Sequence, residues 1–505
     1  MMNWVGRALM ILLLTVAGLP AAAVMAQDKG DRETLRQEVV RRRAALMDKL
    51  GPNALCVIFS GEVKNYERDV DYLYRQDSNL YYLTGITQPD VTLVLLPGNS
   101  SAREILFIPD RDLSKETWFG KNLTREEADQ ISGISVIHST AQFDSFLEAT
   151  LSRRHFGPRR YARSTEFETF FSALDRGEAQ TYLILENGPG LRGQANREWK
   201  LANRIRENFL GIQVRDVSKW LAGLRLVKSP YEISLLRRAT TVTNHALNEA
   251  IKAINSGVKE FEIGALIEYV FRKSNTSGYG YPPIVGSGAN ATVLHYSPRD
   301  VAMKNGDLAL MDVGAEYKQY SADVTRTVPV NGKFTSAQAE IYSIVLQAAD
   351  AALTKVRVGS RISDVHERAV DLLKEGLLRV GLITDKDSEQ YRLWFPHGVS
   401  HWLGMNVHDV GDRDEPFRPG MVLTVEPGIY IREAALDNLR KDPEQHKFLT
   451  AIEPALKKYK DIGIRIEDDV VVTDTSYELL SNGSPRTITE IEALMANRGK
   501  PSTRP

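Results

Sequence analysis

Cysteine is almost absent from this chain, because Cys56 is the single thiol among 505 residues. A lone cysteine cannot form an internal disulfide, and it excludes a structural zinc site built from four thiolates. Cys56 lies in the apolar run 54–59, so we expect a buried thiol with no catalytic role. The fold must therefore be stabilised by its apolar core, and 43% of the residues are hydrophobic.

An excess of charge of either sign is also lacking. The 64 basic and 65 acidic side chains give a net charge of -1, which offers no electrostatic reason to expect nucleic acid as a partner. The charged fraction of 26% is that of an ordinary soluble globular protein. The basic triplet Arg41–Arg43 lies in a helical stretch, and we expect it to form a solvated face.

Long hydrophobic runs are confined to the N-terminus. Arg7 precedes the apolar run 8–19, and small residues then lead to Ala26. This pattern is typical of a secretory signal peptide over residues 1–26, with cleavage after Ala26. An uncleaved membrane anchor is the alternative, although the run is short for a bilayer span. We expect an exported protein, periplasmic or secreted, with no stable membrane insertion after removal of the signal peptide.

An α/β domain is expected over residues 31–222, where short apolar runs alternate with helical stretches. The expected strands are 55–59, 91–96, 104–108 and 181–185, and the expected helices are 32–50, 141–151 and 196–209. Such alternation predicts a three-layer N-terminal domain with a sheet between helices.

A second domain is expected over residues 223–490. Ser229 is a good N-cap, Pro230 suits the first helical position and Glu232 completes a capping box, so a long helix should begin there and run to about Asn255. Further helices are expected at 259–273, 335–356 and 361–380, and strands at 289–295, 307–330, 421–431 and 464–473. The remaining residues, 491–505, are expected to form a disordered tail.

Two aspartates flank an expected turn in the second domain. Asp312 closes an apolar run and Asp323 opens another, eleven residues later. A hairpin centred near Tyr317 and Lys318 would place the two carboxylates about opposite each other, on the same side. Neighbouring carboxylates repel each other unless they are protonated or bound to a cation, so this pair indicates a cation site.

Further ligand-type side chains lie in or beside the later strands of the second domain. Glu426 is held at a sheet margin by Pro427 and Gly428, which end its strand. The complete set is Asp312, Asp323, His401, Glu426 and Glu467. This mostly oxygen set suits two divalent metal ions, with Mn(II) preferred and Zn or Co also compatible.

Four histidines adjoin these carboxylates, namely His295, His397, His401 and His408. His397 and His401 have the spacing of a helical zinc pair, but Pro396 and Gly398 argue against a helix. We expect an extended or looped segment in which one histidine is a ligand. The others are available as hydrogen-bond donors or proton carriers, and a purely structural role for any one of them stays open.

In the segment 463–469, successive side chains are expected to point alternately toward the apolar core and toward the candidate ligands. Ile464 and Ile466 should face the core, while Arg465 and Glu467 share the opposite face. Arg465 can hold the carboxylates in place without competing as a ligand. The two acids that follow, Asp468 and Asp469, are expected to be solvated at the end of the strand.

Six ordered stretches of the second domain resemble the pita-bread metallopeptidases, and Xaa-Pro aminopeptidase (aminopeptidase P) most of all, with prolidase next. They are 293–296, 311–317, 321–327, 397–411, 425–430 and 463–469. The segments 74–85 and 116–120 are similar to the N-terminal domain of aminopeptidase P. The resemblance covers most of residues 35–480 and implies an aminopeptidase P-like domain followed by a pita-bread catalytic domain.

This resemblance also implies roles for individual residues. The five candidate ligands would hold two ions, with Asp323 and Glu467 bridging them. His295 and His408 would contact the scissile peptide, and His397 would lie in the outer shell or the proline pocket. Arg465 would anchor the bridging acids, and Trp118 resembles a tryptophan that reaches a neighbouring subunit, so we expect a homo-oligomer, dimer or tetramer.

The implied reaction is hydrolysis of the bond before a proline at the second position of a peptide. That bond has no N–H to hold, and a two-metal site does not need one, because a metal-bridging hydroxide can attack the carbonyl while Glu426 shuttles its proton. A prolidase that cleaves Xaa-Pro dipeptides is the alternative, and a non-catalytic prolyl-peptide binding module is a minor one. The charged insertion 437–460, between two ligand strands, could narrow the cleft.

Overall fold

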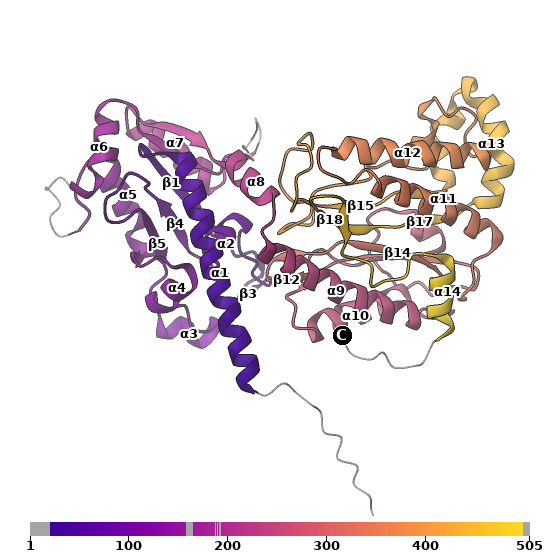
Figure 1. The fold of residues 1–505 in the computed structure, drawn as a ribbon, viewed down its shortest axis with the longest axis horizontal. Coiled ribbons are helices and arrows are strands. Elements are labelled where there is room, and N and C mark those ends of the chain that lie inside the picture. The colour runs from indigo at the N-terminus through magenta and orange to yellow at the C-terminus, as the bar shows by residue number, and fades with distance from the viewer. Residues whose placement is uncertain (1–20, 158–164, 187, 189, 191–192, 498–505) are drawn as a thin grey trace, which may run out of the picture.

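The computed structural model describes residues 21–497 except 158–164, 187, 189, 191 and 192. The expected signal peptide lies mainly outside the described residues, as does the chain beyond residue 497. Within the described part, no helix is both long and apolar enough to cross a bilayer. Two units lie side by side in Figure 1, an N-terminal unit (residues 30–226) and a C-terminal unit (residues 227–497).

The N-terminal unit is a six-stranded sheet in the order β6-β5-β4-β1-β7-β8. Its strands are β1 (Ala54–Phe59), β4 (Thr92–Leu95), β5 (Glu104–Ile108), β6 (Ile137–Ser139), β7 (Gln180–Leu183) and β8 (Gln213–Asp216). Strand β4 runs antiparallel to β1 and β5, whereas the other neighbours are parallel. A small hairpin, β2 (Asn65–Glu67) with β3 (Val70–Asp71), lies outside this sheet.

Successive side chains of β1 point to opposite faces of the sheet and pack in two separate apolar clusters. Cys56 and Ile58 pack in one cluster with α1 and α2, whereas Val57 and Phe59 pack in another with α5, α6 and α7. The helices are α1 (Ala21–Leu50), α2 (Ser78–Thr84), α3 (Leu113–Phe119), α4 (Arg125–Ser132), α5 (Phe143–Leu151), α6 (Glu168–Asp175) and α7 (Arg197–Asn208), with 3-10 turns η1 (Thr140–Gln142) and η2 (Thr165–Phe167). The predicted three-layer arrangement is confirmed, and Cys56 is fully buried.

Two helices join the units, α8 (Ser218–Leu226) and α9 (Pro230–Ala253). The predicted capping box is present: the Ser229 hydroxyl accepts a bond from the Glu232 amide, and the Ser229 amide donates to the Glu232 carboxylate at 3.0 Å. Helix α9 ends two residues before the expected position. The expected domain boundary between residues 222 and 223 falls inside α8.

The C-terminal unit builds its sheets from short strands between two pairs of helices. The α9–α10 pair and the α11–α12 pair lie on opposite sides of the strands in Figure 1. The helices are α10 (Glu260–Lys273), α11 (Ser336–Leu353), α12 (Ile362–Arg379), α13 (His446–Tyr459) and α14 (Ile488–Ala496), with 3-10 turns η3 (Gly288–Thr292), η4 (Glu389–Leu393), η5 (Glu433–Leu436), η6 (Leu439–Lys441) and η7 (Pro443–Gln445).

The strands of this unit form small antiparallel sheets in the orders β10-β11-β14, β13-β12-β9, β15-β18-β19 and β16-β17. They are β9 (Gly278–Tyr279), β10 (Ile284–Ser287), β11 (Leu308–Val313), β12 (Ala315–Tyr317), β13 (Tyr320–Ser321), β14 (Val324–Pro329), β15 (Val422–Val425), β16 (Gly428–Tyr430), β17 (Gly463–Arg465), β18 (Asp468–Val472) and β19 (Tyr477–Leu479). Four of the six resembling stretches lie in strands and at their ends, whereas 293–296 follows η3 and 397–411 runs beside β15.

Some sequence-based expectations are wrong. Residues 289–295 do not form a strand, because Gly288 has a φ of +55° and turns the chain into η3. The expected tail begins too early, since residues 491–496 belong to α14 and Ile491 and Met495 are buried. The basic triplet is not a solvated face: Arg42 and Arg43 are 1% and 0% exposed, because their guanidinium groups bond the carbonyls of Tyr82 and Leu83.

Candidate metal centre

The hairpin between β11 and β14 brings the two aspartates together as the sequence predicts. Asp312 pairs across the sheet with Thr325, and Asp323 directly precedes β14. The intervening β12–β13 turn has positive φ at Lys318 and Gln319, which lies within one residue of the expected centre. The Tyr281 hydroxyl lies 2.5 Å from an oxygen of each carboxylate, and its single proton is shared between the two acids.

His401 lies in a non-helical segment, as expected. Its Nδ1 faces the Trp402 carbonyl oxygen at 3.0 Å, and a carbonyl can only accept, so Nδ1 carries the proton. The other nitrogen, Nε2, faces the acids and becomes a lone-pair donor for a metal ion when its proton is released. It lies 3.3 Å from Asp323 Oδ2 and 3.6 Å from Glu426 Oε1, which is the orientation that a metal-binding histidine needs.

The two glutamates lie where one strand passes into the next. Glu426 stands between β15 and β16, and its amide donates to the Val399 carbonyl at 2.8 Å. Glu467 stands between β17 and β18 and accepts a bond from the Thr325 hydroxyl at 2.6 Å. Ligand atoms of Asp323, His401 and Glu467 all lie within 4.8 Å of one another, so two strand junctions and the His401 segment converge on one point.

All the predicted site residues line one cavity of about 770 Å³. They are His295, Asp312, Asp323, His397, His401, His408, Glu426, Arg465 and Glu467. Among the described residues, none of the segment 437–460 lines this cavity, because α13 packs instead against α11, where Lys458 pairs with Glu340 at 2.8 Å. The insertion therefore does not narrow the cleft.

Burial makes the carboxylates resist ionisation while no metal is present. It raises the pKa of Glu467 well above its usual range, aided by the Asp323 charge, and raises that of Asp312 against the opposing guanidinium of Arg465. It also raises the pKa of Glu426 to about 7, although His401 opposes this. With all four carboxylates ionised and His401 neutral, one buried guanidinium would not balance their charge, so the deprotonated site favours a bound cation.

Burial alone would lower the pKa of His401, but the hydrogen bond and charge of Asp323, together with Glu426, outweigh it and raise the pKa to about 9. Burial and the nearby Arg465 lower the pKa of His397 to about 3, so its imidazole is neutral. Its Nδ1 faces the Gly398 carbonyl at 2.8 Å, and Nε2 accepts from the Tyr430 hydroxyl at 2.8 Å. His397 therefore lines the cavity beside the candidate ligands as a neutral imidazole.

Arg465 holds several side chains of the site in place through hydrogen bonds. Its guanidinium donates to the Asp312 carboxylate, to the Thr325 hydroxyl at 3.1 Å and to the Tyr430 hydroxyl at 2.9 Å. His408 also lines the cavity, and its ring lies edge-on to that of His401, at 4.5 Å between centroids. The lowered pKa of His408, from burial and then from the nearby His401, keeps it neutral at pH 7.

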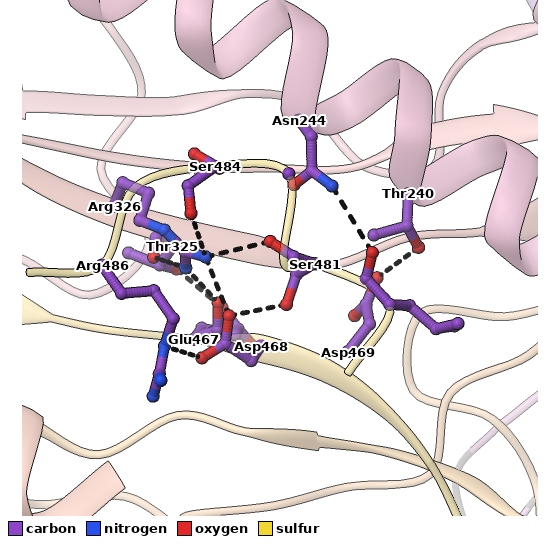
Figure 2. A network of polar contacts seen from close by, with 12 residues as sticks. Thr240, Asn244, Thr325, Arg326, Glu467, Asp468, Asp469, Ser481, Ser484 and Arg486 are labelled. Carbon is purple, nitrogen blue, oxygen red and sulfur yellow. Dashed lines mark hydrogen bonds and ion pairs between the residues drawn. The ribbon is translucent and has the colours of Figure 1, made fainter. Parts of the chain in front are cut away.

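The two acids after Glu467 contradict the expectation of solvation. Asp468 and Asp469 are fully buried. The Asp469 carboxylate accepts from the Asp323 amide at 3.2 Å, so it holds the backbone of a candidate ligand. It also accepts from the Thr240 hydroxyl at 2.8 Å (Figure 2). Sequence reasoning also missed Tyr281, because a tyrosine is not a typical ligand and no local pattern marks it.

The residues fit divalent cations. The donor set is four carboxylates and one imidazole nitrogen, and their surplus negative charge in a buried site requires positive charge. Asp323, Glu467 and His401 form its tightest part. A strand-mounted acid cluster in a peptide-sized cavity, beside a three-layer α/β unit, defines a metal-dependent hydrolase with a pita-bread catalytic unit.

Comparison with known proteins gives the family. The model for metallopeptidase family M24 matches residues 234–474, and that for the aminopeptidase P N-terminal domain matches residues 39–156. The chain is similar to Xaa-Pro aminopeptidase of Escherichia coli, with 35% identity over 92% of this chain and 98% of that protein. It belongs to the aminopeptidase P group of family M24 and is a metallo-aminopeptidase.

Two other similarities bear on the reaction. The chain is similar to Xaa-Pro dipeptidase of Homo sapiens, with 31% identity over 88% of each protein. The solved structure of Pseudomonas aeruginosa aminopeptidase PepP superposes with a TM-score of 0.77 at 33% identity, over 91% of this chain and 98% of that one. Proteins named as an aminopeptidase and as a dipeptidase are thus both similar to this chain, and sequence similarity alone does not distinguish the two substrates.

Proposed function

We propose that this protein removes the first residue from peptides whose second residue is proline. The observation that carries the proposal is the convergence of the five candidate ligands with His295, His397 and His408 on one cavity, in a chain of which 92% is similar to an Xaa-Pro aminopeptidase. The ligands would hold two divalent ions, with Asp323 and Glu467 shared between them. Mn(II) suits the oxygen-rich set best, and Zn or Co would also bind.

Bound there, two divalent ions would lower the pKa of a shared water from about 15.7 toward about 7 and polarise the scissile carbonyl. The chain's own residues supply the rest of the chemistry. Glu426 lies within 3.6 Å of both His401 Nε2 and His397 Nδ1, and it accepts the water proton and passes it to the departing proline nitrogen. His295 and His408, on the cavity wall, stabilise the charge that develops on the carbonyl oxygen.

Substrate length tests this function. The metal-loaded protein is assayed on an Xaa-Pro dipeptide and on Xaa-Pro-Xaa peptides of increasing length, with product identification by mass spectrometry and metal content measured on the same sample. We expect release of the first residue from the longer peptides. Cleavage of the dipeptide alone would identify a prolidase, and binding of prolyl peptides without any cleavage would identify a non-catalytic module.

We also propose that the protein is exported to the periplasm or secreted after cleavage following Ala26, and that it works as a dimer or tetramer. The composition of residues 1–26 supports export. The N-terminal mass of protein recovered from the envelope fraction tests it, since a chain that begins at Met1 in the cytosol contradicts export. Light scattering of the metal-loaded protein measures the number of subunits.

A further inference from the structure

The loop that carries His408 packs against the N-terminal unit. We define the His408 loop as residues 402–409. Leu403 and Met405, at 0% and 2% exposure, belong to the apolar cluster that contains Leu46 of α1 and Leu80 of α2, and Val407 packs against the same cluster. The loop therefore packs in an apolar cluster shared by the two units, to which α1 and α2 of the N-terminal unit contribute.

Polar contacts hold the same loop from the same side. The guanidinium of Arg75 donates to the Met405 carbonyl at 2.5 Å, and the Ser78 hydroxyl donates to the side-chain oxygen of Asn406 at 2.6 Å. Arg75 also pairs with Glu316 of β12 at 2.6 Å, which ties the loop to the hairpin between the two aspartates. These contacts fix the middle of the loop.

Asp409, directly after His408, fixes its end through buried charges. Its carboxylate lies 2.6 Å from Arg225 and 3.2 Å from Lys228, and all three side chains are at most 2% exposed. Arg225 is itself oriented by Asn79, whose side-chain oxygen accepts from it at 2.7 Å. One buried anion thus holds two cations that come from the end of the N-terminal unit and the start of the next one.

The backbone of the loop is shaped around this carboxylate. The Asp409 amide closes the loop by donating to the Trp402 carbonyl at 2.9 Å. A Cβ on Gly404 would lie 2.1 Å from Asp409 Oδ2 and 3.0 Å from the Lys228 side chain, so a glycine is required there. The carboxylate therefore packs against the backbone of the loop that carries the adjacent His408.

We propose that Asp409, held by Arg225 and Lys228, is a positioning residue that sets the place of the His408 imidazole in the cavity, so that the N-terminal unit takes part in catalysis. This inference rests on the proposed peptidase function. Misplacing a group that contacts the reacting atoms by about 1 Å costs on the order of a hundredfold in rate. A desolvated ion pair with fixed geometry supplies the rigidity that such placement requires.

The experiment measures kcat and KM of the metal-loaded protein on an Xaa-Pro-Xaa peptide, for Asp409→Asn and Arg225→Met, each alone and with His408→Ala. We expect each single change to lower kcat by about ten- to hundredfold with KM changed by less than about threefold. Bound metal per chain should stay at the wild-type value. In the His408→Ala background, the same changes should alter kcat by less than about twofold, because the residue they position is gone.

A matched control separates positioning from general stability. Arg42 and Glu232 form another buried ion pair between the units, at 3.3 Å and at most 2% exposure, and it does not touch the His408 loop. Arg42→Met should lower the melting temperature without lowering kcat. If Asp409→Asn proves too unstable, Asn79→Ala removes only the partner that orients Arg225, and Arg225→Lys keeps the charge and should restore part of kcat.

Equal losses of kcat with and without His408, or an unchanged kcat in Asp409→Asn, would overturn the inference. A crystal structure of the metal-loaded Asp409→Asn protein gives a readout that does not depend on activity. We expect the His408 ring to be displaced while His401 stays in place, and a His408 ring in its wild-type position would also overturn the inference. If the wild-type protein cleaves no prolyl peptide, the proposed function fails, yet this structural comparison still decides the positioning role.

Discussion

Arg326 and Asp468 form an ion pair of 2.8 Å in which neither side chain is more than 1% exposed (Figure 2). Arg326 belongs to β14, which follows Asp323, and Asp468 directly follows Glu467. The same guanidinium donates to the Glu467 carbonyl at 2.7 Å. A second arginine, Arg486, lies 2.7 Å from the other Asp468 oxygen. The strands that carry two candidate ligands are thus joined by buried charges behind the metal centre.

Replacing Arg326 by methionine should destabilise the protein strongly. The change leaves Asp468 with less compensation in a buried place, and breaking such a pair costs about 3–5 kcal/mol. Urea unfolding measures the loss. Arg237→Met is the control, because its pair with Glu478 is about half exposed and should contribute less than about 1 kcal/mol. Equal losses of unfolding free energy for the two variants would show that the buried pair stabilises the protein no more than the exposed pair does.

Asp323→Asn should remove a carboxylate that binds both ions of the proposed two-metal site. Asp323 lies close to His401 and Glu467 and accepts a hydrogen bond from the Tyr281 hydroxyl. A neutral amide in its place should therefore weaken binding of both ions. We expect kcat/KM to fall by at least about a thousandfold, with less than the wild-type metal content by elemental analysis. Asp474→Asn makes the same chemical change at an exposed position and should leave both values unchanged. Wild-type turnover of Asp323→Asn in metal-replete buffer would contradict the site.

The positions of the four acidic candidate ligands could be inferred because each has a local signal. Asp312 and Asp323 flank a short hairpin, Pro427 and Gly428 fix Glu426 at a strand end, and the alternation at 463–467 orients Arg465 with Glu467. Such patterns act within a few residues and are visible in a single sequence. The fold class follows for the same reason, from the alternation of apolar runs and helical stretches.

The buried acids could not be predicted, because their partners are remote in the chain. Asp469 accepts from Thr240, 229 residues away, and Asp468 pairs with Arg326, 142 residues away. Nothing next to these acids distinguishes a compensated buried carboxylate from a solvated one at a strand end. Asp409 raises the same problem, since Arg225 reaches it from another unit.

Gly314→Ala should disrupt the hairpin between the two aspartates. A Cβ at Gly314 would lie 1.8 Å from the Ala322 carbonyl oxygen, so the strands would have to separate. Overpacking of this kind costs about 1–3 kcal/mol or more, and the displaced Asp323 should also reduce metal affinity. Thermal unfolding and metal titration measure the two effects. Gly223→Ala in α8, where nothing lies within 4 Å, should be neutral or stabilising by up to about 1 kcal/mol.

Removal of the metal should make stability depend on pH in one direction. In the metal-free folded protein the pKa of Glu426 is raised to about 7 and that of His401 to about 9, whereas the unfolded chain has values near 4.5 and 6.5. Between each pair of values the folded state binds more protons, so the stability of the metal-free protein falls as pH rises, first through Glu426 and then through His401. Divalent ions bind the deprotonated ligands and release those protons, so their stabilising effect grows with pH. Melting temperatures of chelator-treated and Mn(II)-loaded protein at pH 6 and pH 8 measure this. We expect a larger increase on adding Mn(II) at pH 8, and an equal or smaller increase there would contradict binding to this cluster.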